Sequence, residues 1–552
     1  MVQHFSEERI WLKSYDKGVP YEIQCTEVKP YDFLKNTAEK IPERNALIFF
    51  NYKLSYGELK RKVDSFSSFL RSLGVKEGDR VAIDLPNSPQ YIIAYYAINR
   101  IGAIVVQISP TYFEVELNHI IGNSEPKVLV ILDALIPRIS KLREKFPDMI
   151  IVATRIEDYL SFPLNLLYGL QRRIKGEYAP IPQYARKFEE YRKFGNGEEY
   201  SGDRDDVAVL QYTGGTTGTP KGAMLTNGNL VCNTIQSISV IPEEEFGKDN
   251  MLSVIPFFHV FGMTVALNFP VKMGGTMIIQ PKPDVDGIMK LIKKYKPGFF
   301  PGVPTLYSSI LLHKDLNKVD MKSIRFCISG SAPLPVEIIE KWQRITGGHI
   351  VEGYGLSEAS PVTHVNPLYG KVKPGSIGLP VPSTLAKIVD LTTGEREMGI
   401  NEEGELIIKG PQVMKGYYKN EEETRAVLRN GWLYTGDIAK MDEEGYFYIV
   451  DRKKDVIIVG GFNVYPREIE EILYQHPKVK DAAAVGVKDE IHGEVVKAFV
   501  VLKDGETATE QEIKDFFSGK IAKFKIPRYV EFRKELPKTM VGKVLRRELR
   551  ES

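Results

Sequence analysis

Cysteine is scarce in this sequence: the 552 residues include three, Cys25, Cys232 and Cys327. They are far apart along the chain and lack the short spacings of zinc sites and disulfide-rich domains. We therefore expect neither a metal site built on cysteine nor a disulfide framework. Unpaired cysteines are typical of a reducing compartment, so the expected location is cytoplasmic.

Long apolar runs and an excess of one charge are also lacking. The most apolar segment, 91–108, contains Asn99, Arg100 and Gln107, which predicts a buried helix followed by a strand rather than a membrane span. The first nine residues are polar and of mixed charge, unlike a secretory signal. A formal net charge of +2 gives no reason to expect nucleic acid as a partner.

The sequence does have the patterning of an α/β protein. Short apolar runs such as 81–85 and 128–132 alternate with segments of helical periodicity, which predicts mostly parallel sheets flanked by helices. The length requires two or more domains. We place the boundary at the charged segment 451–456, between a large N-terminal domain, 1–450, and a small α+β domain, 457–552.

Segment 212–222, YTGGTTGTPKG, carries the most specific signal, and it follows an apolar run typical of a strand. Glycines let backbone N–H groups converge on an anion, threonine hydroxyls add donors, and the lysine adds a cation. The Gly-Lys-Ser/Thr ending of a Walker A loop is absent. A polyphosphate is the ligand that this composition favours, and a flexible surface loop is the alternative. The candidate residues are Thr213, Gly214, Gly215, Thr216, Thr217, Gly218 and Lys221.

Further segments have residues suited to a nucleotide. The turn 329–334 lies between an apolar strand and a helix, where doubly wound sheets bind nucleotides. In segment 352–358, Tyr354 offers a ring for stacking on a base, and Glu358 offers oxygen atoms to a hard cation such as Mg²⁺. Asp437 can accept hydrogen bonds from both hydroxyls of a ribose. Segments 329–334 and 352–358 can also be interpreted as structural turns that bind no ligand.

In their order along the chain, these motifs resemble the acyl-adenylate-forming superfamily, which includes acyl-CoA synthetases, luciferases and the adenylation domains of peptide synthetases. The resemblance covers about residues 30–550. It implies that the C-terminal domain is a mobile lid with its hinge at Lys454. It also implies that Lys543, which would otherwise be interpreted as a surface lysine, is the lysine that drives adenylation.

The resemblance assigns further roles. His259, in an aromatic loop, would lie beside the substrate carboxylate, and the Asp that amino-acid-activating relatives carry near this point is missing. Asp437 would bind the ribose with Arg452 nearby, and Ser357 stands where the family usually has Thr. The implied catalytic residues are Lys543, His259 and Glu358. The other implied nucleotide-binding residues are Gly330, Ser331, Ala332, Glu352, Gly353, Tyr354, Gly355, Ser357, Asp437 and Arg452.

The implied reaction uses ATP, Mg²⁺ and coenzyme A. A carboxylic acid and ATP give acyl-AMP and pyrophosphate, and CoA then gives acyl-CoA and AMP. Joining two anions requires cations and positioning rather than a protein nucleophile. Lys543 would bridge the carboxylate and the α-phosphate, and Glu358 and Thr213 would hold the Mg²⁺.

The acid is predicted from likeness to a subfamily. Segments 375–384 and 451–470 look most like those of bacterial-type long-chain fatty acyl-CoA synthetases. Medium-chain and arylpropenoic acids remain alternative substrates, and a separate carrier protein remains an alternative acceptor of the acyl group. A luciferase-like oxidising enzyme and a non-enzymatic nucleotide-binding protein are the alternatives from other classes. The intact set of candidate residues argues against the second of these.

Segment 156–194 breaks the α/β pattern. Its apolar side chains are followed by Arg172, Arg173 and Lys175. This order predicts either a helix on a membrane surface or a helical insertion packed on the domain, with solvated charges. The expected partners are a fatty acid, ATP and CoA, and peripheral membrane contact and a homodimer are left open.

Overall fold

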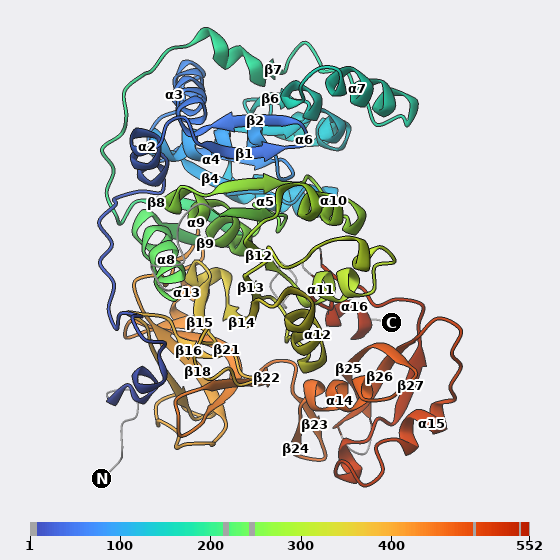
Figure 1. Ribbon diagram of the computed structural model, residues 1–552. Helices are drawn as coiled ribbons and strands as arrows, with labels where there is room; N and C mark the ends of the chain where they lie inside the picture. The colour runs from blue at the N-terminus through green and yellow to red at the C-terminus, as the bar shows by residue number, and fades with distance from the viewer. Residues whose placement is uncertain (1–7, 214–219, 242–248, 490–492, 540–541, 551–552) are drawn as a thin grey trace.

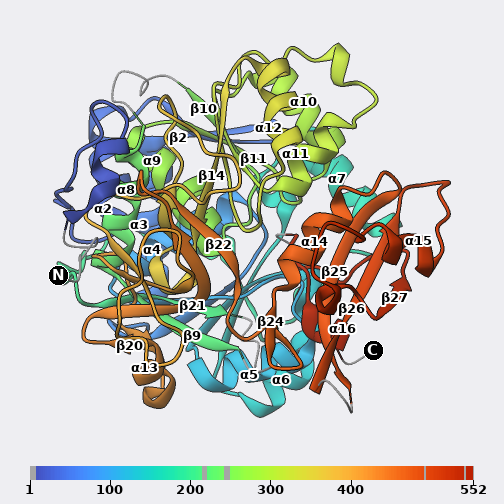
Figure 2. The ribbon, with the colours of Figure 1, turned by 90° about the horizontal axis from the view of Figure 1, so that it is seen from below.

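The computed structural model describes residues 8–213, 220–241, 249–489, 493–539 and 542–550. Figures 1 and 2 show the C-terminal residues as a separate body beside the larger part of the chain. The predicted α/β class is confirmed, with mostly parallel sheets flanked by helices in the large part and a small α+β part at the C-terminus. The domain bounds 1–450, 451–456 and 457–552 stay a prediction.

The first large sheet carries the turns expected at the nucleotide. Its nine strands have the order β16-β15-β14-β13-β12-β10-β11-β1-β2, and the run from β14 to β1 is parallel. The strands are β1 (Asn45–Phe49), β2 (Tyr52–Ser55), β10 (Asn250–Ser253), β11 (Thr276–Ile279), β12 (Phe299–Gly302), β13 (Phe326–Ser329), β14 (His349–Gly355), β15 (Val362–Val365) and β16 (Leu379–Pro380).

The second large sheet carries the Gly/Thr-rich segment. Its eight strands have the order β19-β9-β8-β4-β3-β5-β6-β7, parallel from β8 to β7 and antiparallel at β9 and β19. The strands are β3 (Arg80–Asp84), β4 (Ile104–Gln107), β5 (Val128–Leu132), β6 (Ile150–Thr154), β7 (Arg186–Lys187), β8 (Val207–Thr213), β9 (Lys221–Thr226) and β19 (Gly416–Tyr417).

Two smaller sheets follow along the chain. An antiparallel one contains β17 (Leu385–Val389), β18 (Gly404–Lys409), β20 (Leu428–Arg429), β21 (Trp432–Met441) and β22 (Phe447–Arg452). The C-terminal one contains β23 (Ile457–Val459), β24 (Phe462–Val464), β25 (Val479–Asp489), β26 (Gly493–Leu502) and β27 (Tyr529–Phe532). Residues of the C-terminal sheet and its helices form hydrophobic cores of their own.

Helices flank these sheets. The longer ones are α2 (Tyr31–Lys40), α3 (Tyr56–Ser72), α4 (Pro89–Arg100), α5 (Glu114–Ser124), α7 (Leu164–Ile174), α8 (Asn227–Ser239), α10 (Val285–Tyr295), α11 (Pro304–Leu311), α12 (Val336–Thr346) and α14 (Pro466–Tyr474). The shorter ones are α6 (Ser140–Lys145), α9 (Phe269–Met273), α13 (Glu421–Val427), α15 (Glu510–Asp515) and α16 (Arg546–Arg550).

Helix α4 and strand β4 confirm that segment 91–108 is a buried pair. Every residue of α4 is buried. Arg100 is accommodated there because its guanidinium lies 3.1 Å from Asp64 Oδ1 and donates to Ser67 Oγ at 2.8 Å. In the described ranges, no helix is both long enough and apolar enough to cross a membrane.

The cysteines differ from the expectation. Cys25 and Cys232 are joined by a disulfide, with Cα atoms 5.4 Å apart, whereas Cys327 is a buried thiol. The prediction of unpaired cysteines is therefore wrong for Cys25 and Cys232 and holds for Cys327. A separation of 207 residues along the chain does not limit the distance after folding, since the segment before α2 lies against α8.

Candidate active site

The hairpin of β8 and β9 carries the expected phosphate loop. Gly214, Gly215, Thr216, Thr217 and Gly218 lie outside the described residues. Thr213 and Lys221 flank them and face each other across the antiparallel ladder. The Lys221 ammonium pairs with Glu423 Oε2 at 2.7 Å and lies over the ring of Tyr417, 5.5 Å from its centre. A cation is thus held at the mouth of the hairpin.

Tyr417 connects this hairpin to Glu358. It lies in β19, which pairs with β9, and its hydroxyl donates to Glu358 Oε1 at 2.8 Å. The backbone oxygen of Glu358 also accepts from Met414 N at 2.8 Å. Tyr417 was not among the predicted site residues. Its signal was weak, a Gly-Tyr pair in a segment between two strands, and nothing in the sequence linked it to a carboxylate 59 residues away.

Glu358 and Thr213 are suited to a magnesium ion that takes its other ligands from substrate phosphates and water. Among the described residues, no group of three or more His, Cys, Asp or Glu side chains could hold a metal. Mg²⁺ is commonly held by one or two carboxylates, with substrate phosphates and water as its other ligands. One carboxylate with one hydroxyl is therefore a suitable donor set for Mg²⁺ bound to a nucleotide.

Asp437 lies at the centre of a group drawn from three strands. The hydroxyl of Tyr354 (β14) donates to Asp437 Oδ2 at 2.5 Å, and the Nε of Arg452 (β22) lies 3.2 Å from Asp437 Oδ1. Asp437 and Arg452 are direct partners in the β21–β22 register. Burial, with the charge of Asp437, raises the pKa of Tyr354, so its hydroxyl remains a donor.

The turn after β13 is supported by Glu352. Glu352 Oε2 accepts from Leu334 N at 3.1 Å, and burial raises the pKa of this carboxyl to about 7. Gly330, Ser331 and Ala332 form the turn, and Gly330 N donates to Gly302 O at 3.2 Å. Glu352 therefore orients the backbone of the turn through Leu334.

The segment after Glu352 is tightly packed. Gly353 and Gly355 belong to β14, and a Cβ at Gly355 would lie 2.2 Å from Pro361 O. Such a close approach of two backbones requires glycine at this position. Ser357 then begins a single 3-10 turn, Ser357–Ala359, which also contains Glu358.

His259, in the large part of the chain, and Lys543, in the C-terminal part, come together. Burial, with the charge of Lys543, lowers the pKa of His259 to about 4, so the imidazole is neutral at pH 7. Its Nδ1 accepts from Phe261 N at 3.3 Å. A Cβ on Gly542 would lie 3.0 Å from Thr305 Oγ1. The C-terminal body thus brings Lys543 to the N-terminal part of the site.

Cations gather around Asp437. Burial and the charges of Arg452 and Lys454 lower the pKa of Lys543 to about 8, although its side chain keeps contact with solvent. Burial and the charges of Arg452 and Lys221 also lower the pKa of Lys454 to about 8. Repulsion among ammonium and guanidinium groups lowers a lysine pKa because it disfavours the charged form. The arrangement can attract and hold anions.

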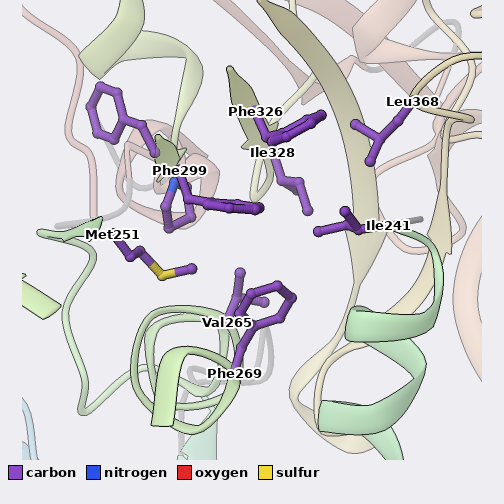
Figure 3. A pocket seen from close by; sticks show the side chains of 10 residues that line it. Ile241, Met251, Val265, Phe269, Phe299, Phe326, Ile328 and Leu368 are labelled. Atoms are coloured by element: carbon purple, nitrogen blue, oxygen red, sulfur yellow. The ribbon is translucent and has the colours of Figure 1, made fainter. Parts of the chain in front are cut away.

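An apolar cavity lies beside the helix that follows His259. It has a volume of about 20 Å³. Val265, in the π-helix Gly262–Asn268, contributes to its lining. Figure 3 shows aromatic and aliphatic side chains from several elements around it. A space of this size holds about one water-sized probe, so this cavity is a packing void and not a tunnel for an acyl chain.

The site and the fold define the class of protein. The model of the AMP-binding enzyme family matches residues 34–418, and that of the AMP-binding enzyme C-terminal domain matches residues 468–543. The chain therefore belongs to the family of AMP-binding enzymes.

Two curated relatives resemble nearly the whole chain. A long-chain-fatty-acid–CoA ligase of Bacillus subtilis is 46% identical and is aligned over 99% of this chain and 98% of its own length. A protein of the same name from Salmonella typhi is 38% identical over the same shares of both chains.

Solved structures resemble the fold closely. ATP-bound MatB from Rhodopseudomonas palustris has a TM-score of 0.82 at 30% identity, covering 94% of this chain and 98% of its own. The anthranilate CoA ligase AuaEII in complex with anthranoyl-AMP has a TM-score of 0.84 at 27% identity, covering 96% and 97%. The similarity thus includes both the large part and the C-terminal part of the chain.

Proposed function

We propose that this protein is an ATP-dependent long-chain fatty acid–CoA ligase. The names of the two relatives that align with nearly its whole length support the substrate. The observation that supports adenylation is the set of cations around Asp437, because this reaction joins two anions, a carboxylate and ATP. Arg452 pairs with Asp437, and the charges of Arg452 and Lys454 act on Lys543.

In the first half-reaction, a carboxylate oxygen of the fatty acid attacks the α-phosphorus of ATP, and the bond to pyrophosphate breaks. Lys543 donates hydrogen bonds to the carboxylate and the α-phosphate, while neutral His259 orients the acid. Segment 213–221 holds the leaving phosphates. Glu358 and Thr213 would hold Mg²⁺, which would supply neutralisation of the phosphate charge.

The nucleotide is held by groups already described. The ring of Tyr354 and the turn of Gly330, Ser331 and Ala332 contact adenine, and Asp437 accepts from the ribose hydroxyls. The oxygen atoms of Asp437 contact Tyr354 and Arg452. Ribose therefore shares or displaces these contacts when ATP binds.

In the second half-reaction, the C-terminal lid rotates about Lys454 and withdraws Lys543. The CoA thiol then attacks the acyl carbon of acyl-AMP, AMP leaves, and the thiol proton passes to solvent. Lid movements of this kind admit one substrate and exclude water during the other step. CoA as acceptor and Lys454 as hinge are parts of the proposal.

The test is pyrophosphate release with ATP and Mg²⁺ across acids from acetate to C18, plus cinnamates, with and without CoA. We expect a maximum at C12 to C18 and sustained turnover only with CoA. A maximum at short, medium-chain or aromatic acids would contradict the substrate, and sustained turnover only with an acyl carrier protein would contradict the acceptor.

The half-reactions can be separated with one substitution. Lys543→Ala should abolish adenylation and leave the conversion of supplied acyl-AMP to acyl-CoA largely intact. Lys534→Ala, at an exposed lysine nearby in the chain, is the matched control and should retain both. Equal loss of both half-reactions in Lys543→Ala would rule out the alternating lid.

The place of action completes the proposal. Long acyl chains partition into lipid, so we propose that the enzyme meets its substrate at a membrane surface, as a peripheral protein. The homodimer that the sequence left open stays a prediction, which a molar mass from light scattering would test.

A further inference from the structure

Helix α7 presents an apolar side to solvent. Leu166 and Leu170 are 64% and 57% exposed, and Ile174 at the end of the helix is 78% exposed. Leu167 and, just before the helix, Phe162 are exposed by 58% and 77%. Spacings of three and four residues put the helical members of this set on one side of the helix. Figure 1 shows α7 at the upper edge of the molecule, away from the C-terminal body.

Buried contacts hold α7 in this orientation. Leu164 and Tyr168 pack against the main hydrophobic core. Arg172 is buried on the same side, with Nη2 2.6 Å from Asp133 Oδ1 and Nη1 2.7 Å from Glu157 Oε2. Turning the helix to bury its leucines would break these ion pairs and leave buried charges without partners. The packing and the ion pairs on the opposite side of α7 therefore keep its apolar side exposed.

Cations border the apolar side. Arg173 and Lys175 are exposed at the C-terminal end of α7, and the Arg173 guanidinium lies 4.5 Å from the centre of the Tyr178 ring. Glu177 is also exposed there. Asp133 and Glu157, by contrast, are paired internally with Arg172. An apolar strip bordered by basic side chains is complementary to an interface of acyl chains and anionic headgroups.

We propose that α7 is the surface by which this protein docks on anionic lipid membranes. The helix lies parallel to the interface, with Phe162, Leu166, Leu167, Leu170 and Ile174 among the acyl chains. Arg173 and Lys175 extend to the phosphates, since long basic side chains reach toward the polar layer. The inference rests on the proposed function, because a lipid-soluble substrate gives this enzyme a reason to bind lipid.

The structure favours lipid over a second copy of the chain. A stable protein interface uses about 20–30 residues on each side, whereas the exposed apolar set consists of five side chains on and next to an 11-residue helix. A lipid surface requires no matching shape, so a single protruding helix is enough to bind it.

The test is vesicle flotation with the full-length protein, without ATP or fatty acid. The vesicles contain phosphatidylcholine alone or a mixture with phosphatidylglycerol. We expect wild type to bind both and the mixture more tightly. The variant L166E/L167E/L170E should bind at least about tenfold more weakly. The loss of even one leucine from the lipid lowers the partition coefficient by about that factor. R173Q/K175Q should lose about fivefold per charge on the mixture only.

The controls separate docking from other effects. Leu312→Glu replaces an 83% exposed leucine on another helix end and should bind as wild type does. Ile174→Glu repeats the test if the triple variant fails to reach the wild-type melting temperature. Wild-type binding by these α7 variants, or no binding of wild type to either vesicle, would overturn the inference. A wild-type dimer that the α7 variants lose would also overturn it, in favour of a second copy.

Failure of the proposed function gives a different pattern. Vesicle binding is measured without catalysis, so it persists if the enzyme prefers another acid. Conversely, pyrophosphate release from a water-soluble acid without vesicles should be equal in wild type and the α7 variants. The two hypotheses can thus fail separately.

Discussion

The ionisation of Lys543 predicts how adenylation depends on pH. Burial and neighbouring cations lower the pKa of Lys543 to about 8, and only the ammonium form can bridge a carboxylate and a phosphate. Below pH 8 Lys543 is charged, so its ionisation should not change kcat/KM in this range. Above pH 8 the charged fraction falls about tenfold per pH unit, and kcat/KM should fall with it. His259, with a pKa of about 4, is neutral throughout this range.

Two substitutions isolate this ionisation. In Lys543→Arg the guanidinium stays charged, so the decline above pH 8 should disappear even if the overall rate is lower. Lys454→Ala removes a cation that lowers the pKa of Lys543, so the decline should move to higher pH. Lys534→Ala should retain the wild-type profile.

The assay is pyrophosphate release between pH 6 and pH 10 at subsaturating acid and ATP, where kcat/KM reports the free enzyme. An unchanged decline near pH 8 in Lys543→Arg would refute the reasoning, because another group would then be responsible. A decline that moves to lower pH in Lys454→Ala would refute the electrostatic coupling between the two lysines.

Further predictions concern single residues. Tyr417→Phe removes the hydrogen bond to Glu358, worth about 1 kcal/mol at this partly solvated carboxylate, and should raise the KM for MgATP about fivefold; Tyr418→Phe is the control, and an unchanged KM would contradict the positioning role. The pKa of Glu352, raised to about 7 from 4.5, means that stability is lost as pH rises through this interval, by at most about 3 kcal/mol. As pH rises from 5 to 8, the melting temperature of Glu352→Gln should therefore increase relative to that of wild type. A constant difference between the two melting temperatures would contradict this prediction. The denatured, unreduced protein should have one reactive thiol, Cys327, and three after reduction; three in both states would disprove the disulfide.

Local features of this protein follow from the sequence because they depend on neighbouring residues. The Ser55–Glu58 capping box that begins α3 is one such feature, since both of its hydrogen bonds lie within one turn. The buried pair of α4 and β4 follows from polar residues inside an apolar segment. The family also follows from the sequence, because motifs such as 352–358 are short and keep their order.

Contacts between distant segments depend on the tertiary structure. The disulfide of Cys25 with Cys232, the bond from Tyr417 to Glu358 and the effect of Lys543 on His259 all join residues that no local pattern relates. Helix α7 shows the same limit within one element. Its periodicity determines which side chains share a side, but the pairing of Arg172 with Asp133 and Glu157 decides which side faces solvent.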